Sequence, residues 1–176
     1  MGFNSLYNFT QTRYVLLFIV TSLLFSAFAC GHYSFSGSMA SHIKSIAIPL
    51  FEDRTAEFGI KEELSDALIA EFTRDNTLKI ADRRNADSIL EGVIRQIRDQ
   101  AGAYDSEETV QELKVYLTVD VRYFDATKKK VVWEDRLTQW GAFDPNLSGT
   151  DAREAAITEA IEKLTTEILN RTVSGW

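Results

Sequence analysis

The chain has 176 residues, a formal net charge of −7 at pH 7, 45% hydrophobic residues and a single cysteine. The excess of acidic residues argues against nucleic-acid binding, because neutralising phosphates requires a basic face. A single cysteine excludes a disulfide within the chain, and a chain with only two prolines is not expected to hold a long low-complexity segment.

The first predicted element is an export signal at the N-terminus. Residues 14–28 are uncharged and mostly apolar, and Arg13 is the only charged residue before them. The run is shorter than the ~20 residues that a membrane-spanning helix needs. It ends at Ala29 followed by Cys30, which is the arrangement of a lipoprotein signal. We therefore expect cleavage before Cys30 and acylation of that cysteine. The alternatives are ordinary signal cleavage and retention as an anchor helix.

This interpretation divides the chain into three parts. Residues 1–29 are the signal peptide, residues 30–42 are a lipidated tether, and residues 43–176 form one domain of ordinary size.

Apolar periodicity predicts the first half of the domain. Residues 43–50 are rich in β-branched side chains and predict a strand that ends near Pro49. Apolar residues recur every four positions in residues 57–74, which predicts a helix, and residues 77–81 predict a short strand. Residues 87–99 fit a helix face by periodicity, although Gly92 in their middle argues against a good helix.

The second half gives clearer patterns. Apolar and polar residues alternate over 110–124, which predicts a half-buried antiparallel strand, and residues 131–141 predict the strand that returns from it. Residues 152–170 predict an amphipathic helix, with Asp151 as its N-cap and Glu154 as the capping-box partner. The fold class is therefore α+β, with helices packed on one face of a mostly antiparallel sheet.

The sequence offers no catalytic constellation. It has no Gly-x-Ser-x-Gly motif, and its glycines do not cluster into a phosphate-binding loop. His32 and His42 both lie in the tether, without a cysteine, histidine or carboxylate at metal-ligand spacing. We therefore predict no enzymatic activity, no cofactor and no metal.

Two surface features are candidates for binding. Lys128, Lys129 and Lys130 lie at a predicted hairpin turn, where their ammonium groups could contact the phosphates of an anionic glycolipid. The alternative is a solvated turn that discourages aggregation of the strand ends. Tyr116 lies on the polar side of its strand and is a candidate for a partner interface, the alternative being an isolated exposed tyrosine.

Several segments resemble the LPS-assembly lipoprotein family, LptE. Residues 30–38 (CGHYSFSGS) are similar to the C-G-Y-x-F-x-G start of that family, with His32 inserted before Tyr33. Residues 43–55 (IKSIAIPLFEDRT) resemble its I-K-x-I-A-I-P-x-F-x-N-x-T segment, with Asp53 where asparagine is commoner. Residues 63–68 and 86–92 also fit, so the resemblance covers nearly all of the chain after the signal.

The resemblance implies a fold of two helices on a four-stranded sheet, which makes residues 87–99 a strand. It also implies a lipid-anchored protein at the periplasmic face of the outer membrane. Such a protein would plug and help to assemble the LptD β-barrel, which inserts lipopolysaccharide into the outer leaflet, and direct binding of lipopolysaccharide is possible. The alternative is a lipoprotein regulator of a penicillin-binding protein, because residues 46–55 also look like the first strand and loop of such regulators. The short tether favours the barrel plug.

Overall fold

The structure is a computed structural model that describes residues 42–104, 110–144 and 150–174. The chain divides into two units, Met1–Phe35 and Ser36–Trp176, and every described residue belongs to the second.

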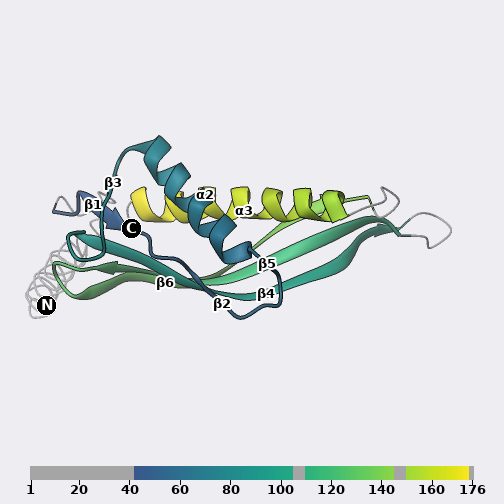
Figure 1. The fold of residues 1–176 in the computed structure, drawn as a ribbon, viewed down its shortest axis with the longest axis horizontal. Helices are drawn as coiled ribbons and strands as arrows, with labels where there is room; N and C mark the ends of the chain where they lie inside the picture. The colour runs from purple at the N-terminus through teal and green to yellow at the C-terminus, as the bar shows by residue number, and fades with distance from the viewer. Residues whose placement is uncertain (1–41, 105–109, 145–149, 175–176) are drawn as a thin grey trace, which may run out of the picture. The chain divides into compact units, whose positions relative to one another are not determined.

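A mixed six-stranded sheet forms one layer of this unit (Figure 1). Its strand order is β3-β1-β4-β5-β6, and β2 pairs with β4 as well. The three long strands β4, β5 and β6 form an antiparallel meander, whereas β1 and β2 pair in parallel with β4, and β3 pairs in parallel with β1. The strands are β1 (Ser45–Ala47), β2 (Glu52–Asp53), β3 (Lys79–Ile80), β4 (Ser88–Tyr104), β5 (Val110–Asp125) and β6 (Lys130–Phe143).

The predicted α+β class is confirmed, with more strands than the four expected. The predicted strand at 43–50 is shorter in the structure, where Pro49 separates β1 from the two-residue β2. Proline has no N–H to donate to a strand ladder, so the pairing with β4 stops at Ala47 and resumes at Glu52.

Two helices lie on the same face of the sheet (Figure 1). Helix α2 (Ile60–Asp75) follows Gly59, which has φ 80°, and ends at Asn76, whose left-handed backbone lets its N–H donate to the Phe72 carbonyl. Helix α3 (Thr150–Val173) includes Asp151 in its first turn. The prediction that Asp151 is the N-cap is therefore wrong, although a carboxylate there still favours the helix dipole.

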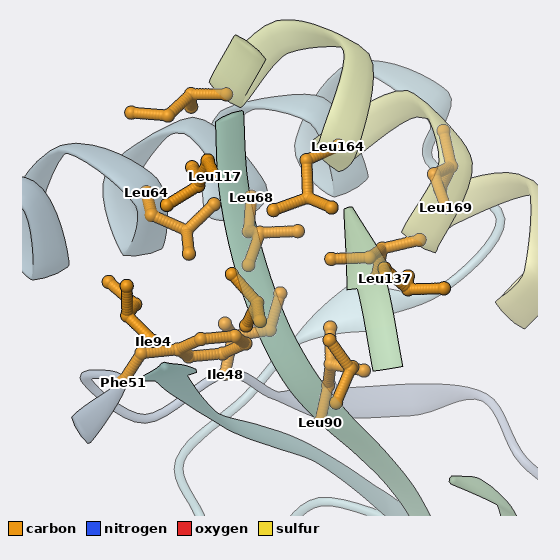
Figure 2. Close-up of a cluster of buried hydrophobic side chains, with 14 of the residues drawn as sticks. Ile48, Phe51, Leu64, Leu68, Leu90, Ile94, Leu117, Leu137, Leu164 and Leu169 are labelled. Carbon is orange, nitrogen blue, oxygen red and sulfur yellow. The ribbon is translucent and has the colours of Figure 1, made fainter. Parts of the chain in front are cut away.

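The hydrophobic core fills the space between the helices and the sheet (Figure 2). Leu64 and Leu68 of α2 and Leu164 of α3 are fully buried there, and from the sheet Leu90 and Leu117 are fully buried as well. Burial of a leucine side chain contributes about 2 kcal/mol before the entropy cost of ordering it. The core therefore fixes which face of β4, β5 and β6 is covered by helices and which remains open.

Of residues 87–99, all but Asp87 belong to strand β4, as the family resemblance implies and contrary to their helical period. The register between β4 and β5 shifts at Ile94 and Gln96, which leaves Arg95 as an extra residue. Such a β-bulge changes the phase of the strand. Leu90, Ile94 and Ile97 consequently all reach the core, at spacings of four and three. That spacing is the one expected for a helix face.

Candidate interaction surfaces

The face of the sheet away from the helices carries charges of both signs. In the middle of this face the Asp120 carboxylate accepts hydrogen bonds from Arg95 Nε and Arg136 Nε, each at 2.6 Å. Next to it, Arg122 Nη1 lies 3.8 Å from Glu91 Oε1, and Glu91 also accepts a hydrogen bond from Arg83. These pairs connect β4, β5 and β6 across the open face.

The arginines keep Asp120 ionised. The hydrogen bond from Arg136, together with the weaker influence of Arg95, lowers the pKa of Asp120 to about 2. A groove of about 410 Å³ runs beside this cluster and is lined by both signs of charge, including Arg83, Arg122 and Glu52. Since neither sign dominates, the groove fits a mixed polar surface better than a single anion or cation.

Tyr116 lies in a row of aromatic and cationic side chains on the same open face. The strand register places it between Arg98 of β4 and Trp140 of β6. The Arg98 guanidinium carbon is 5.2 Å from the centre of the Tyr116 ring, and the Nζ of Lys114 is 3.9 Å from the centre of the Trp140 ring. Tyr116 is therefore half-buried by its neighbours, and the possible interface is the whole row.

The residues of the predicted turn, Lys128, Lys129 and Lys130, are exposed; the first two lie between β5 and β6, and Lys130 is the first residue of β6. The Lys128 N–H donates to Asp125 Oδ1 at 2.8 Å, and Lys129 takes the left-handed backbone with φ 53°. Among the described residues no carboxylate forms an ion pair with any of these three lysines. The three ammonium groups are therefore available to an outside partner.

His42, predicted to be the last residue of the tether, is attached to the domain. Its Nε2 lies 2.6 Å from Asp125 Oδ2, although the two residues are 83 apart in sequence. Burial raises the pKa of Asp125, but the Lys128 N–H and His42 outweigh burial, so the pKa lies below its ordinary value. The contact pins the start of the domain to the β5–β6 turn.

A second ionic cluster holds the loop between β2 and α2. Arg153 of α3 donates to both carboxylate oxygens of Glu57, each at 3.0 Å, and its Nε donates to Asp99 of β4 at 2.9 Å. The hydrogen bond to Glu57 is the main cause of a raised Arg153 pKa. Phe58, which follows Glu57 in the sequence, projects fully into solvent.

The residues singled out from sequence do not form one site. Tyr116 is nine positions along β5 from Asp125, which corresponds to about 30 Å at the rise of a β-strand. The predicted lipid attachment residue, Cys30, lies outside the described residues. Within the described part of the chain, no cluster of three or more His, Cys, Asp or Glu side chains could hold a metal ion. None of the helices in that part is long and apolar enough to cross a membrane.

Sequence reasoning missed three of these features. His42 and Asp125, Asp120 with its arginines, and Arg153 with Glu57 all join residues that are distant in sequence. The strand register could have supplied the Asp120 cluster once β4, β5 and β6 were aligned, because all three positions face the open side. No local pattern marks the other two.

Two helices on one face of a mixed sheet define an α+β domain, and its open face carries paired charges. The chain belongs to the LptE lipopolysaccharide-assembly family, whose pattern matches residues 43–172. No curated protein sequence matches this chain.

Solved structures share the fold at low sequence identity. Protein XCC0632 from Xanthomonas campestris is 12% identical, with a TM-score of 0.58, over 78% of this chain and 86% of the other. The hypothetical protein CT253 from Chlamydia trachomatis is 12% identical, with a TM-score of 0.56, over 73% and 95%. The PelC dodecamer from Paraburkholderia phytofirmans is 14% identical, with a TM-score of 0.54, over 78% and 95%. At these identities the likeness establishes the fold alone.

Proposed function

We propose that this protein is a lipid-anchored factor of lipopolysaccharide assembly that plugs and helps to assemble an LptD-like β-barrel of the outer membrane. The observation that carries the proposal is the match to the LptE family, because it covers residues 43–172 and so nearly the whole described domain.

The lipid anchor belongs to the same proposal. Cleavage before Cys30 would leave an acylated cysteine, residues 31–42 as a tether, and a domain from residue 43 to residue 176. Two or more acyl chains provide stable membrane attachment, which one chain does not. The protein would then stay at the periplasmic face of the outer membrane.

The open face of the sheet supports the role of a plug. The lumen of an outer-membrane barrel is polar, so a plug needs charges of both signs and not an apolar surface. The clusters around Asp120 and Glu91 provide such a surface, and Tyr116 and Trp140 add aromatic contact area. A plug acts through shape and charge complementarity, so the proposal includes no catalytic residue and no cofactor.

The role of Lys128, Lys129 and Lys130 rests on charge. Their ammonium groups suit phosphates of any anionic lipid, lipopolysaccharide included. Direct binding of lipopolysaccharide by the turn is therefore a proposal separate from the barrel partnership.

The partnership can be tested with a photo-reactive phenylalanine in place of Tyr116 in living cells. Ultraviolet light should link the protein to one large outer-membrane β-barrel, identified by mass spectrometry. The matched control is the same substitution at Tyr123, which is on the same strand but is 1% exposed and faces the helices. The control should give no intermolecular product.

A second measurement separates the proposal from its alternative. Depletion of the protein should reduce lipopolysaccharide at the cell surface while peptidoglycan synthesis continues. Crosslinks to a penicillin-binding protein, with unchanged surface lipopolysaccharide, would contradict the barrel partnership and support the regulator of peptidoglycan synthesis.

A further inference from the structure

The lysines of this chain fall into two groups. Three of the eight have a glutamate within ion-pair distance: Lys61 with Glu62, Lys114 with Glu112 and Lys163 with Glu159. The other five are exposed and have no ion pair among the described residues. We call these five the lysine rim: Lys44, Lys79, Lys128, Lys129 and Lys130.

Backbone contacts place the lysine rim at one end of the sheet. The Lys79 N–H donates to the Lys44 carbonyl at 3.0 Å, and the Lys44 N–H donates to Asp87 Oδ2 at 3.0 Å. The Asp87 carbonyl accepts from the N–H of Ala126, two residues before Lys128, at 2.9 Å. The starts of β1 and β3 and the β5–β6 turn therefore lie together (Figure 1).

The carboxylates of Asp87 and Asp125, which lie at this end of the sheet, accept hydrogen bonds from groups other than the lysine ammonium groups. Asp87 accepts hydrogen bonds from the Lys44 N–H and from the backbone and hydroxyl of Ser45, which lower its pKa. Asp125 is bound by His42 and by the Lys128 N–H, and only 5% of its side chain is exposed. The ammonium groups of the rim are therefore exposed and have no ion-pair partner within residues 42–104, 110–144 and 150–174, in a chain whose net charge is −7.

The chain enters the domain at this same end. His42, held to Asp125, is separated from Cys30 by eleven residues. Even fully extended, the connection from Cys30 to His42 spans about 40 Å. Strand β5 alone is about 50 Å long at the rise of a β-strand, so a connection of that length cannot span the sheet from one end to the other.

We propose that the lysine rim is a membrane-facing surface that binds the anionic phospholipid headgroups of the leaflet that holds the lipid anchor. The proposal rests on the proposed function only for the anchor at Cys30. Basic residues are attracted to an anionic surface only within about one Debye length, roughly 8–10 Å, and a connection of at most about 40 Å allows the rim to reach that surface. The rim holds this end of the domain at the surface of that leaflet.

The test measures the acetylation rate of each lysine separately. Processed protein purified from bacterial membranes is reconstituted on vesicles of phosphatidylcholine, or of equal parts phosphatidylcholine and phosphatidylglycerol, and treated with an amine-acetylating reagent. Mass spectrometry then gives the acetylation rate at every lysine. Lys61, Lys114 and Lys163 are the internal controls.

On phosphatidylglycerol vesicles the five rim lysines should react about fivefold more slowly than on phosphatidylcholine, the factor that corresponds to one basic side chain near an anionic surface. The control lysines should keep their rates, and high salt should abolish the difference. Equal rates at the rim on both kinds of vesicle would overturn the proposal. Protection by lipopolysaccharide in phosphatidylcholine vesicles, without protection by phosphatidylglycerol, would overturn it in favour of lipopolysaccharide binding.

Flotation distinguishes failure of the rim from failure of the anchor. Protein that does not float with phosphatidylcholine vesicles lacks the anchor. In that case, the unaltered protein should still float with phosphatidylglycerol vesicles. Loss of this flotation after Lys128→Ser, Lys129→Ser and Lys130→Ser together would still support the rim. Absence of flotation on both kinds of vesicle overturns the rim as well.

Discussion

At the scale of single residues, Asp120 is the carboxylate whose environment is most clearly set by the strand register. Its Oδ1 accepts from Arg136 of β6 and its Oδ2 accepts from both Arg136 and Arg95 of β4, so three strands meet at one side chain. Arg95 follows the buried Ile94 and so faces the open side, where the β-bulge leaves it without a register partner on β5 and its side chain reaches Asp120.

Replacement of Asp120 by asparagine tests this cluster. The pKa of Asp120 is lowered from 3.8 to about 2 in the folded state, so its stabilisation is present above pH 4 and is lost as the pH falls through about 2. Because Arg136 is largely exposed, we expect Asp120→Asn to lower the free energy of unfolding at pH 7 by about 1 kcal/mol. Urea unfolding followed by circular dichroism at pH 7, 4 and 2.5 should show the difference shrinking towards low pH.

Asp66 provides the matched control. It is exposed on α2 and forms no ion pair among the described residues, so Asp66→Asn should leave stability unchanged. A deficit of Asp120→Asn that is constant with pH would show that its charge contributes nothing to the fold.

At the scale of elements, strand β4 shows what the sequence could predict and what it could not. The alternation of β5 is uninterrupted from Val115 to Tyr123, and its boundaries and buried face follow directly from it. In β4 the bulge makes the spacing between buried residues irregular, and the result imitates a helix. A bulge depends on the partner strand, so one strand read alone cannot reveal it; the family resemblance corrected the assignment.

At Gly141 of β6, the backbone of α3 packs so closely against the strand that it leaves no room for a side chain. A Cβ on Gly141 would lie 1.9 Å from the Ala156 carbonyl oxygen of α3, and the backbone on both sides would have to move. We expect Gly141→Ala to lower the free energy of unfolding by about 3 kcal/mol, at the upper end of overpacking effects. Equilibrium urea unfolding measures the change.

Gly102→Ala is the comparison for this experiment. Its added Cβ would meet no backbone within 3 Å but only side-chain atoms, Glu112 Oε1 at 2.7 Å and Lys114 Cε and Cγ at 2.9 and 3.0 Å, and these flexible side chains can shift. We expect its cost to be less than about 1 kcal/mol. Similar losses for both variants would mean that the contact between β6 and α3 is not what selects glycine at position 141.

At the scale of the whole molecule, the fold class and the family could be predicted from the sequence more completely than the candidate interaction surfaces. The periodicities of α2, β5 and α3 were sufficient for an α+β domain, and residues 43–55 carried the family resemblance. The candidate site was only partly predictable. The lysine turn is contiguous in sequence, whereas Lys44 and Lys79 join it only because parallel strands start at the same edge. Pairings of that kind depend on topology, which composition and spacing do not contain.

The mixed topology of the sheet has a consequence for the order in which the protein folds. The β5–β6 pairing begins across a four-residue turn, whereas Ile46 pairs with Ser88 and must close a loop of about forty residues. Loop-closure entropy makes such distant pairing slower than hairpin formation. The meander should therefore be present in the folding transition state, with β1 joining afterwards.

Folding and unfolding rates of Val119→Ala and Ile46→Ala should give a high φ-value for Val119 and one near zero for Ile46. The reverse ranking would mean that the N-terminal strands nucleate the domain. If β1 does join last, an unfolding domain would release first the strand that follows the proposed lipid anchor and tether.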